Sequence, residues 1–201
     1  MLLKIHLLGQ FKLQANHIPL ELPSRPAQSL LAYLALNAGV RHRREKLASL
    51  MWPESTELNA RSYLRKVLWQ MRKSLISGSL SWEDYLQISE IEVTFNDRSD
   101  YWLDADLLLS RVDDSTADDL IEIVQLYRGE LLPGFYDQWT VIERERLLLA
   151  YHQKMNLLLE CLIKSAQWHA VLEWGEQWIQ MAYSPEAAFR ALMIEIGRAH
   201  V

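Results

Sequence analysis

The sequence predicts an α+β N-terminal half followed by an all-α C-terminal half. Three observations predict this division. Apolar and polar residues alternate in the first 22 residues, helical periodicity then gives way to a second alternating pair of segments, and helical periodicity alone continues beyond residue 104. Because half of the 201 residues are hydrophobic and 23% are charged, the chain can bury a substantial core.

The first 22 residues are typical of a small antiparallel sheet. Alternation predicts half-buried strands over 3–7, 11–15 and 18–22, separated by turn residues. Pro19 cannot donate a hydrogen bond to a neighbouring strand, so we expect the third strand at an edge of the sheet.

Helical periodicity then predicts three helices, over 25–37, 43–51 and 56–76. Ser24 is expected to cap the first helix, and Ser55 or Thr56 the third. Pro53 ends the second helix sharply, because it disfavours helical geometry in the residue before it.

Two further alternating segments predict a hairpin after the third helix. Its apolar side chains are expected on or near the core: Leu86, Ile88, Ile91, Val93 and Phe95. Residues 97–104 then form a polar joint with two aromatic residues. We place the domain boundary there, which gives a first domain over 1–98 and a second over 99–201.

The second domain is predicted to consist of helices over 104–111, 116–128, 137–165, 168–182 and 185–199. A capping box predicts the start of the helix over 116–128, because Ser115 and Thr116 precede Asp118 and Asp119. Short helices in antiparallel pairs favour repeat-like stacking. Such arrays need a capping unit, and the last residues offer none, so we expect a fragment of a longer protein that is truncated at its C-terminus.

Charge is divided between the two halves. Residues 1–100 carry a net charge of +3 and residues 101–201 a net charge of −8, while 25–73 holds 10 basic and 3 acidic residues. An overall pI of about 5.7 would by itself argue against nucleic-acid binding. The asymmetry indicates a basic module attached to an acidic one.

The helix over 56–76 has two separate faces when each residue advances by 100°. The apolar face is built to pack and contains Ala60, Tyr63, Leu64, Val67, Leu68, Met71 and Leu75. The opposite face carries five cations and no acid, and contains Arg61, Ser62, Arg65, Lys66, Trp69, Arg72 and Lys73. Like charges one turn apart repel by a few tenths of a kcal/mol, so this face favours binding to a polyanion.

A cationic helix that follows a shorter helix across a tight turn suits the major groove of DNA. Arginines can contact guanine edges, lysines and Ser62 can hold phosphates, and Asn59 can reach an adenine edge. The alternative is a basic surface helix with no ligand. We expect Trp69 to pack against the hairpin or a neighbouring domain, because tryptophan is usually mostly buried.

The ordered set of short motifs resembles the Streptomyces antibiotic regulatory protein (SARP) type of bacterial transcriptional regulator over nearly the whole chain. In the first half the similar segments are Leu8-Gly9-Gln10-Phe11, Arg25-Pro26-Ala27-Gln28-Ser29-Leu30-Leu31-Ala32-Tyr33-Leu34-Ala35, Arg44-Glu45-Lys46-Leu47, Met51-Trp52-Pro53-Glu54, Ala60-Arg61-Ser62-Tyr63-Leu64-Arg65 and Met71-Arg72-Lys73. In the second half they are Tyr127-Arg128-Gly129-Glu130-Leu131-Leu132-Pro133-Gly134-Phe135, Trp139 and Glu143-Arg144-Glu145-Arg146-Leu147.

The resemblance implies an OmpR-like winged-helix domain joined to a bacterial transcriptional activator domain of tetratricopeptide-like helices. It implies that 56–76 is the recognition helix and 85–96 the wing. The DNA contacts would then be Arg61, Arg65, Lys66, Arg72 and Lys73. The wing tip, Ser89-Glu90, and Glu92 on its strand are poorly suited to a minor groove, so we expect the wing to add little affinity. Larger family members also have a nucleotide-binding module, and no phosphate loop occurs in these residues.

Catalytic and metal-binding patterns are weak, so we expect no enzyme, no cofactor and no metal. No two histidines are three to five residues apart, and Cys161 on an apolar helical segment is expected to be a buried core thiol. Asp104 and Asp106 could bind a divalent cation, although helix-start residues that interact with the dipole are the commoner case. Glu143 to Arg146 are interpreted as solvated or domain-joining ion pairs.

The functional hypothesis is a DNA-binding transcriptional activator that docks the helix over 56–76 in the major groove. The acidic second domain would contact RNA polymerase or a second copy of the protein on DNA. Trp174 and Trp178 share a helix face, which indicates core packing or, alternatively, a partner groove. Without a membrane span or a secretory signal, we expect a cytoplasmic protein. The rival hypothesis is a protein-interaction adaptor that does not bind DNA, and a metal enzyme is a distant third.

Overall fold

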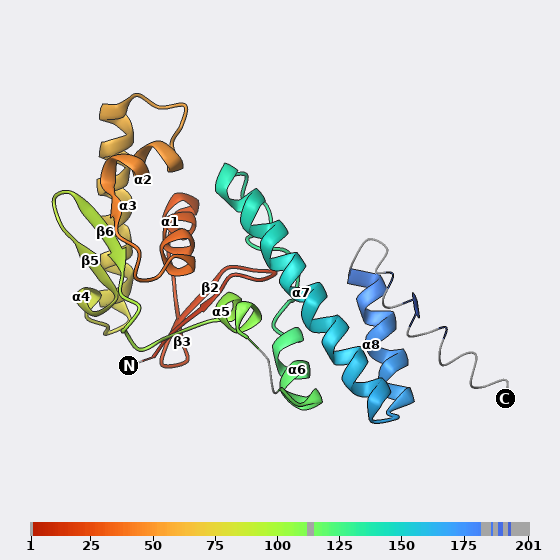
Figure 1. The fold of residues 1–201 in the computed structure, drawn as a ribbon. Helices are drawn as coiled ribbons and strands as arrows, with labels where there is room; N and C mark the ends of the chain where they lie inside the picture. The colour runs from red at the N-terminus through yellow and green to blue at the C-terminus, as the bar shows by residue number, and fades with distance from the viewer. Residues whose placement is uncertain (1, 112–114, 182–185, 187–188, 191–192, 194–201) are drawn as a thin grey trace.

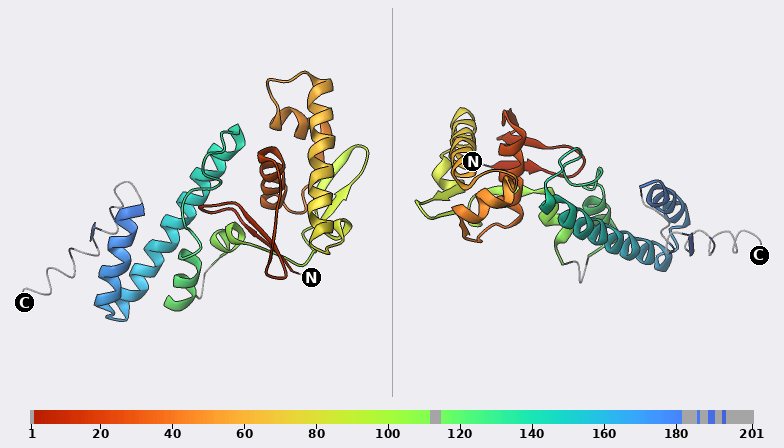
Figure 2. Two further views of the ribbon diagram at one scale, coloured as in Figure 1. Left: turned by 180° about the vertical axis from the view of Figure 1, so that it is seen from behind. Right: turned by 90° about the horizontal axis from the view of Figure 1, so that it is seen from above.

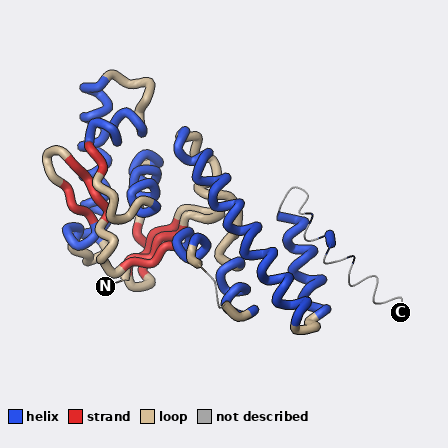
Figure 3. Tube along the Cα trace, viewed as in Figure 1, coloured by secondary structure: helices blue, strands red, loops and turns tan. Residues whose placement is uncertain are grey.

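The computed structural model describes residues 2–111, 115–181, 186, 189–190 and 193. Among the described residues, strands occur only up to Leu103, and the regular elements beyond it are all helices (Figures 1 and 3). The α+β half followed by a helical half confirms the predicted fold class at this level. The strands are β1 (Leu3–His6), β2 (Lys12–Ala15), β3 (Ile18–Leu20), β4 (His42–Arg43), β5 (Leu86–Ile88), β6 (Glu92–Phe95) and β7 (Tyr101–Leu103). The helices are α1 (Arg25–Leu36), α2 (Arg44–Met51), α3 (Glu57–Ser77), α4 (Trp82–Tyr85), α5 (Asp104–Leu109), α6 (Ala117–Val124), α7 (Gln138–Lys164) and α8 (Trp168–Met181).

The N-terminal sheet has the strand order β3-β2-β1-β7. The alternating residues therefore form the three predicted strands, and β3 with Pro19 lies at the edge as expected. The fourth strand, β7, was not predicted. It runs parallel to β1, with Leu3 opposite Tyr101, inside the segment that was expected to be a polar joint. The boundary between residues 98 and 99 stays a prediction.

Helices α1 and α2 both pack against α3, and α1 lies between α3 and α7 (Figures 1 and 2). The apolar face of α3 is buried at Leu64, Val67 and Leu68, as its periodicity predicts. Thr56 caps α3, because its hydroxyl accepts from the backbone N–H of Asn59 at 3.4 Å. Ser24 stands at the start of α1, but its hydroxyl accepts no capping hydrogen bond and donates to Gln70 Oε1 at 2.6 Å.

The second sheet has the order β4-β6-β5 and contains the predicted hairpin. Val93 and Phe95 are fully buried, whereas Ile91 is 68% exposed, so its predicted place near the core is wrong. The ladder closes at the pair Ile88 and Val93, which leaves Ile91 in the turn. There the hydroxyl oxygen of Ser89 accepts from the backbone N–H of Ile91 at 3.2 Å.

Asp104 connects α5 to the first sheet. Its side chain is 2% exposed, and its carboxylate accepts from the backbone N–H groups of Leu7 and Leu8 at 2.8–3.0 Å. Burial raises the pKa of this carboxyl group, while the hydrogen bonds from Leu8 and Leu7 act in the opposite direction. Asp104 is thus both a helix-start residue and a structural link to β1. Asp106 instead accepts from the hydroxyl of Tyr101 at 3.3 Å.

The C-terminal half packs α6 and α8 against α7 (Figure 1). The capping box at the start of α6 is present between Thr116 and Asp119. Trp174 and Trp178 are buried, which confirms the core-packing interpretation of that face. Cys161 is only half-buried, so the expectation of a buried core thiol is wrong. The helix predicted over 185–199 falls mostly outside the described residues, and the tetratricopeptide-like character of this half stays a prediction.

The segment between α6 and α7, together with the first turn of α7, docks on the first half. Leu132 donates its backbone N–H to the carbonyl oxygen of Leu7 at 3.0 Å, and Trp139 Nε1 donates to Ser29 Oγ at 3.3 Å. Arg144 holds this segment by donating to three carbonyl oxygens at 2.7–2.8 Å, those of Leu131, Leu132 and Phe135. Arg144 is therefore a structural residue of the junction, whereas Arg146 forms an exposed ion pair with Glu143.

The contact between α7 and α8 predicts a loss of stability in acid. Trp178 Nε1 donates to His152 Nδ1 at 2.7 Å, so the ring must be neutral at that nitrogen, and burial lowers the pKa of His152. Below pH 6.5 the His152 side chain of the unfolded chain binds a proton that the folded chain excludes. The free energy of unfolding therefore decreases as the pH is lowered from 6.5 to the pKa of His152 in the folded chain. Urea unfolding followed by circular dichroism at pH 7.5 and 5.5 measures this.

Burial lowers the pKa of His6 and His42 as well, so the loss in acid has three contributors. His152→Asn keeps an acceptor for Trp178 but does not titrate, and is expected to reduce the difference between the two pH values. An undiminished difference in this variant would contradict the assignment to His152.

Candidate nucleic-acid interface

The outer face of α3 presents the predicted contact residues. Its N-terminal cap and buried apolar stripe fix the helix against α1 and α2, so the other side chains point away from the core. Six of the seven predicted contact residues are exposed, namely Asn59, Arg61, Ser62, Arg65, Lys66 and Lys73. Tyr63, expected on the apolar face, is 44% exposed, and its ring centroid lies 5.8 Å from that of Trp52.

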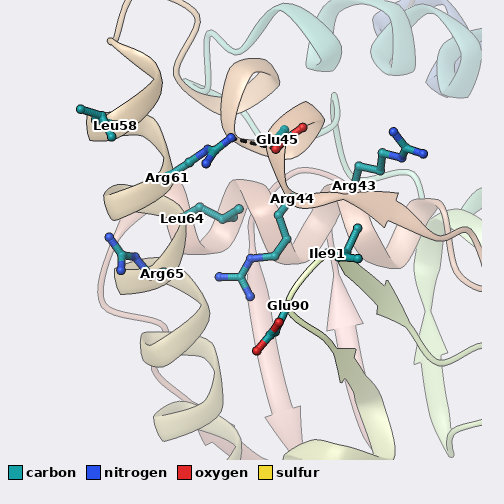
Figure 4. Close-up of a pocket in the computed structure, with 9 residues that line it drawn as sticks. All are labelled: Arg43, Arg44, Glu45, Leu58, Arg61, Leu64, Arg65, Glu90 and Ile91. Carbon is teal, nitrogen blue, oxygen red and sulfur yellow. Dashed lines mark hydrogen bonds and ion pairs between the residues drawn. The ribbon is translucent and has the colours of Figure 1, made fainter.

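An open hollow of about 790 Å³ lies between α2, α3 and the turn of the β5–β6 hairpin. Figure 4 shows α3 on one side and the hairpin turn on the other, with Arg44 extending between them. Four of the side chains around the hollow are cationic and two are acidic. The lining residues are Arg43, Arg44, Glu45, Leu58, Arg61, Leu64, Arg65, Glu90 and Ile91.

Arg61 is held by two carboxylates. Its Nη2 lies 2.8 Å from Glu45 Oε1 and 2.5 Å from Glu57 Oε1. The helical period places no acidic residue on the cationic face of α3 itself. Glu57 lies one turn before Arg61 in the same helix, and Glu45 belongs to the neighbouring helix α2. The expectation of five uncompensated cations is therefore wrong for Arg61. Both partners come from the first half of the chain, and the guanidinium group is not turned toward the acidic second half.

Arg44 is a candidate contact residue that the sequence analysis missed. It stands at the start of α2, where its backbone N–H donates to the carbonyl oxygen of Ile91 at 2.8 Å. Its guanidinium Nη1 donates to the carbonyl oxygen of Ser89 at 3.0 Å, which ties α2 to the hairpin turn. The helical periodicity of α3 could not reveal it, because it belongs to another helix.

The surroundings of Arg44 are electropositive. Burial lowers the pKa of Arg44, and the neighbouring charges of Arg72 and Arg65 lower it further. Arg44 of α2 and Arg65 of α3 both line the hollow, and the charge of Arg72 acts on Arg44 from α3. Like charges that repel in the free protein are favoured when they meet a polyanion.

Arg72 is half-buried and differs from the other predicted contacts. Its guanidinium carbon lies 4.1 Å from the ring centroid of Trp82, and its buried Nε has no hydrogen-bond partner among the described residues. Trp69 was expected to pack against the hairpin or a neighbouring domain, but it is 58% exposed, so that expectation is wrong. Lys73 Nζ lies 5.3 Å from the ring centroid of Trp69, so this exposed ring carries a cation over its face.

Within residues 2–111, 115–181 and the four later described positions, no group of three or more His, Cys, Asp or Glu residues could hold a metal ion. Over those same residues, none of the helices combines the length and the apolar character needed to cross a bilayer.

Comparisons with known proteins agree with the fold. No family model and no curated protein matches the chain. One similar solved structure is Mycobacterium tuberculosis EmbR in complex with a low-affinity phosphopeptide, with a TM-score of 0.72 and 17% sequence identity. The match covers 87% of this chain and 49% of that chain, so this chain spans about half the length of EmbR. Over most of its residues, the chain therefore has the fold of the corresponding half of EmbR.

Proposed function

We propose that this chain is a sequence-specific DNA-binding transcriptional regulator that acts as an activator and docks α3 in the major groove. The single observation that carries the proposal is the exposed cationic face of α3 beside an open, electropositive hollow. A major groove about 12 Å wide admits one helix, and the groove walls are phosphates that cations attract. The motif resemblance to the SARP type and the fold shared with EmbR support the same function.

The contact residues divide by chemistry. Arg65 is proposed to contact base edges, because its guanidinium fork matches two acceptors of guanine. Its side chain is exposed and forms no ion pair with another described residue, so it is available for such a contact. Asn59 can read adenine from the start of the helix. Lys66, Lys73 and Ser62 are proposed to hold phosphates, and Arg44 to hold the backbone on the far side of the hollow.

The helical half, taken as a second domain over 99–201, is proposed to contact protein. Its net charge of −8 over 101–201 disfavours a second DNA surface. RNA polymerase or a second copy of the chain on DNA are the proposed partners, and a cytoplasmic location follows from this function. The adaptor hypothesis draws support from the carboxylates of Glu45 and Glu57 on Arg61 and from Glu90 beside the hollow.

Selection of bound sequences from random duplex DNA tests the proposal. An enriched motif is expected, and its half-site spacing would report self-association on DNA. Random duplex should also bind at low salt, with an affinity that falls as salt rises. The adaptor hypothesis predicts no binding even at low salt, and that result would overturn the proposed function.

Single lysine variants are expected to weaken binding to all duplexes to the same extent. Lys66→Gln or Lys73→Gln removes one phosphate contact, so the slope of log affinity against log salt should fall by about one. Fluorescence anisotropy titrations at several salt concentrations measure the slope. Lys164→Gln, at the exposed end of α7, is the matched control and should leave the slope unchanged. A loss confined to one selected sequence would contradict the phosphate role.

A further inference from the structure

A second hollow of about 450 Å³ lies where the β1–β2 hairpin meets the loop after α6. It brings together residues more than a hundred positions apart in the chain. Its lining includes two cationic and two amide side chains and a single acid. The lining residues are His6, Leu8, Gly9, Gln10, Lys12, Gln14, Asp104, Leu126 and Arg128.

Backbone contacts hold the two walls of this junction hollow together. Gly9 donates its N–H to the carbonyl oxygen of Glu130 at 3.0 Å, two positions beyond the similar bond between Leu132 and Leu7. Gly9 has a φ of +82°, and a Cβ there would lie 2.8 Å from the carbonyl oxygen of Arg128. The close approach therefore requires glycine and fixes the backbone of Arg128 against the hairpin.

The cations at the junction hollow lack acidic partners. Among the described residues, the side chains of Lys12 and Arg128 make neither an ion pair nor a hydrogen bond. Lys4 lies nearby with its Nζ 5.9 Å from the ring centroid of Trp102. The charges of Arg128, Lys12 and Lys4 lower the pKa of His6 after the larger effect of burial, so all three cations act on the same ring.

The single acid in the lining does not neutralise these cations directly. The carboxylate of Asp104 is 2% exposed and accepts hydrogen bonds from the backbone N–H groups of Leu7, Leu8 and Ala105. Its oxygens are thus engaged by the backbone beneath the hollow. Lys12 and Arg128 are left as the exposed charges of the two opposite walls.

We propose that the junction hollow binds a small multivalent anion that carries phosphate or carboxylate groups. Arg128 offers a planar fork for two oxygens, Lys12 a compact charge from the opposite wall, and Gln10 and Gln14 offer amide donors. A volume of about 450 Å³ is within the range of small-molecule sites. The anion would contact both halves of the chain, so its binding would stabilise their docking.

Isothermal titration calorimetry of the full chain tests this proposal with pyrophosphate and with citrate at constant ionic strength. Saturable binding of one anion per chain is expected. Binding of pyrophosphate alone would identify a phosphorylated ligand, and binding of citrate alone a carboxylate ligand. Lys12→Gln and Arg128→Gln should each weaken binding about tenfold, because each removes a charge-assisted hydrogen bond.

Two control variants separate this hollow from the rest of the surface. Lys164→Gln and Arg65→Gln remove exposed cations elsewhere, the second from α3, and should bind the anion as the original chain does. Gln14→Glu keeps the size of the side chain but adds a repelling charge, and should abolish binding while circular dichroism shows a folded chain. Equal binding by all variants, or no binding of either anion, would overturn the proposal.

The ring of His6 gives an independent measurement. An anion near Lys12 and Arg128 offsets the cations that lower the pKa of His6, so this pKa should rise on binding. Nuclear magnetic resonance titration of the His6 ring, assigned with His6→Asn, follows the change. A pKa that is the same with and without a saturating anion would place the anion elsewhere and contradict the site.

Discussion

Replacing Arg65 by alanine is expected to weaken binding to the selected duplex by about 1–3 kcal/mol, or about ten- to a hundredfold in affinity. Arg65 is exposed on the outer face of α3 and is one of the residues that line the hollow (Figure 4). A guanidinium group that pairs with two acceptors of guanine loses both when it is truncated. Fluorescence anisotropy with the selected duplex, and with one altered at the contacted base pair, measures the loss and its specificity.

Arg98→Ala is the matched control, because Arg98 is an exposed arginine on the loop after the hairpin. It should bind the selected duplex as tightly as the original chain. Arg61→Ala is expected to cost less than Arg65→Ala, since Arg61 must first leave Glu45 and Glu57. Unchanged binding by the double variant of Arg61 and Arg65 would refute the docking of α3.

The same two carboxylates predict that Glu45→Gln strengthens binding. The change frees Arg61 from one of its ion pairs and removes a negative charge from the hollow. Tighter binding of random and selected duplexes alike is expected, by a few-fold, because exposed ion pairs contribute about 0–1 kcal/mol. Anisotropy titrations of both duplexes at low salt measure this, and weaker binding would contradict a restraining role for Glu45.

Local patterns predicted most of the fold because they act along the chain. Strands β1, β2 and β3 follow from alternation, and α3 follows from its capping residue and its two faces. Both depend on residues within one turn or one strand. The exposed cations of α3 could be predicted for the same reason, since the helical period fixes which side chains share a face.

Features that depend on distant contacts escaped the sequence analysis. Strand β7 is short, and its pairing with β1 joins residues almost a hundred positions apart. The ion pair of Arg61 with Glu45 needs α2 to lie beside α3, and the contact of Arg72 with Trp82 needs α4 to pack on α3. Arg44 belongs to the candidate site only because the hairpin turn folds back onto α2. Such relations follow from tertiary packing, which no single period encodes.

Replacing Asp104 by alanine is expected to lower the free energy of unfolding by about 3 kcal/mol. The change leaves the buried backbone N–H groups of Leu7 and Leu8 without an acceptor, and each such group costs about 1–3 kcal/mol. Because the carboxylate joins α5 to the end of β1, the loss should also loosen the junction of the two halves. Urea unfolding at pH 7, followed by circular dichroism, measures the change.

Asp106→Ala is the matched control two positions along the same helix. Asp106 is exposed and accepts one hydrogen bond of 3.3 Å from Tyr101, so its removal is expected to cost about 0.5 kcal/mol. The loss for Asp104→Asn should lie between those of the two alanine variants. The amide oxygen of Asn can still accept a hydrogen bond, whereas its N–H₂ group faces backbone N–H donors. Equal losses for the two alanine variants would show that the backbone of Leu7 and Leu8 finds other partners, and that the first half of the chain holds α5 without the carboxylate of Asp104.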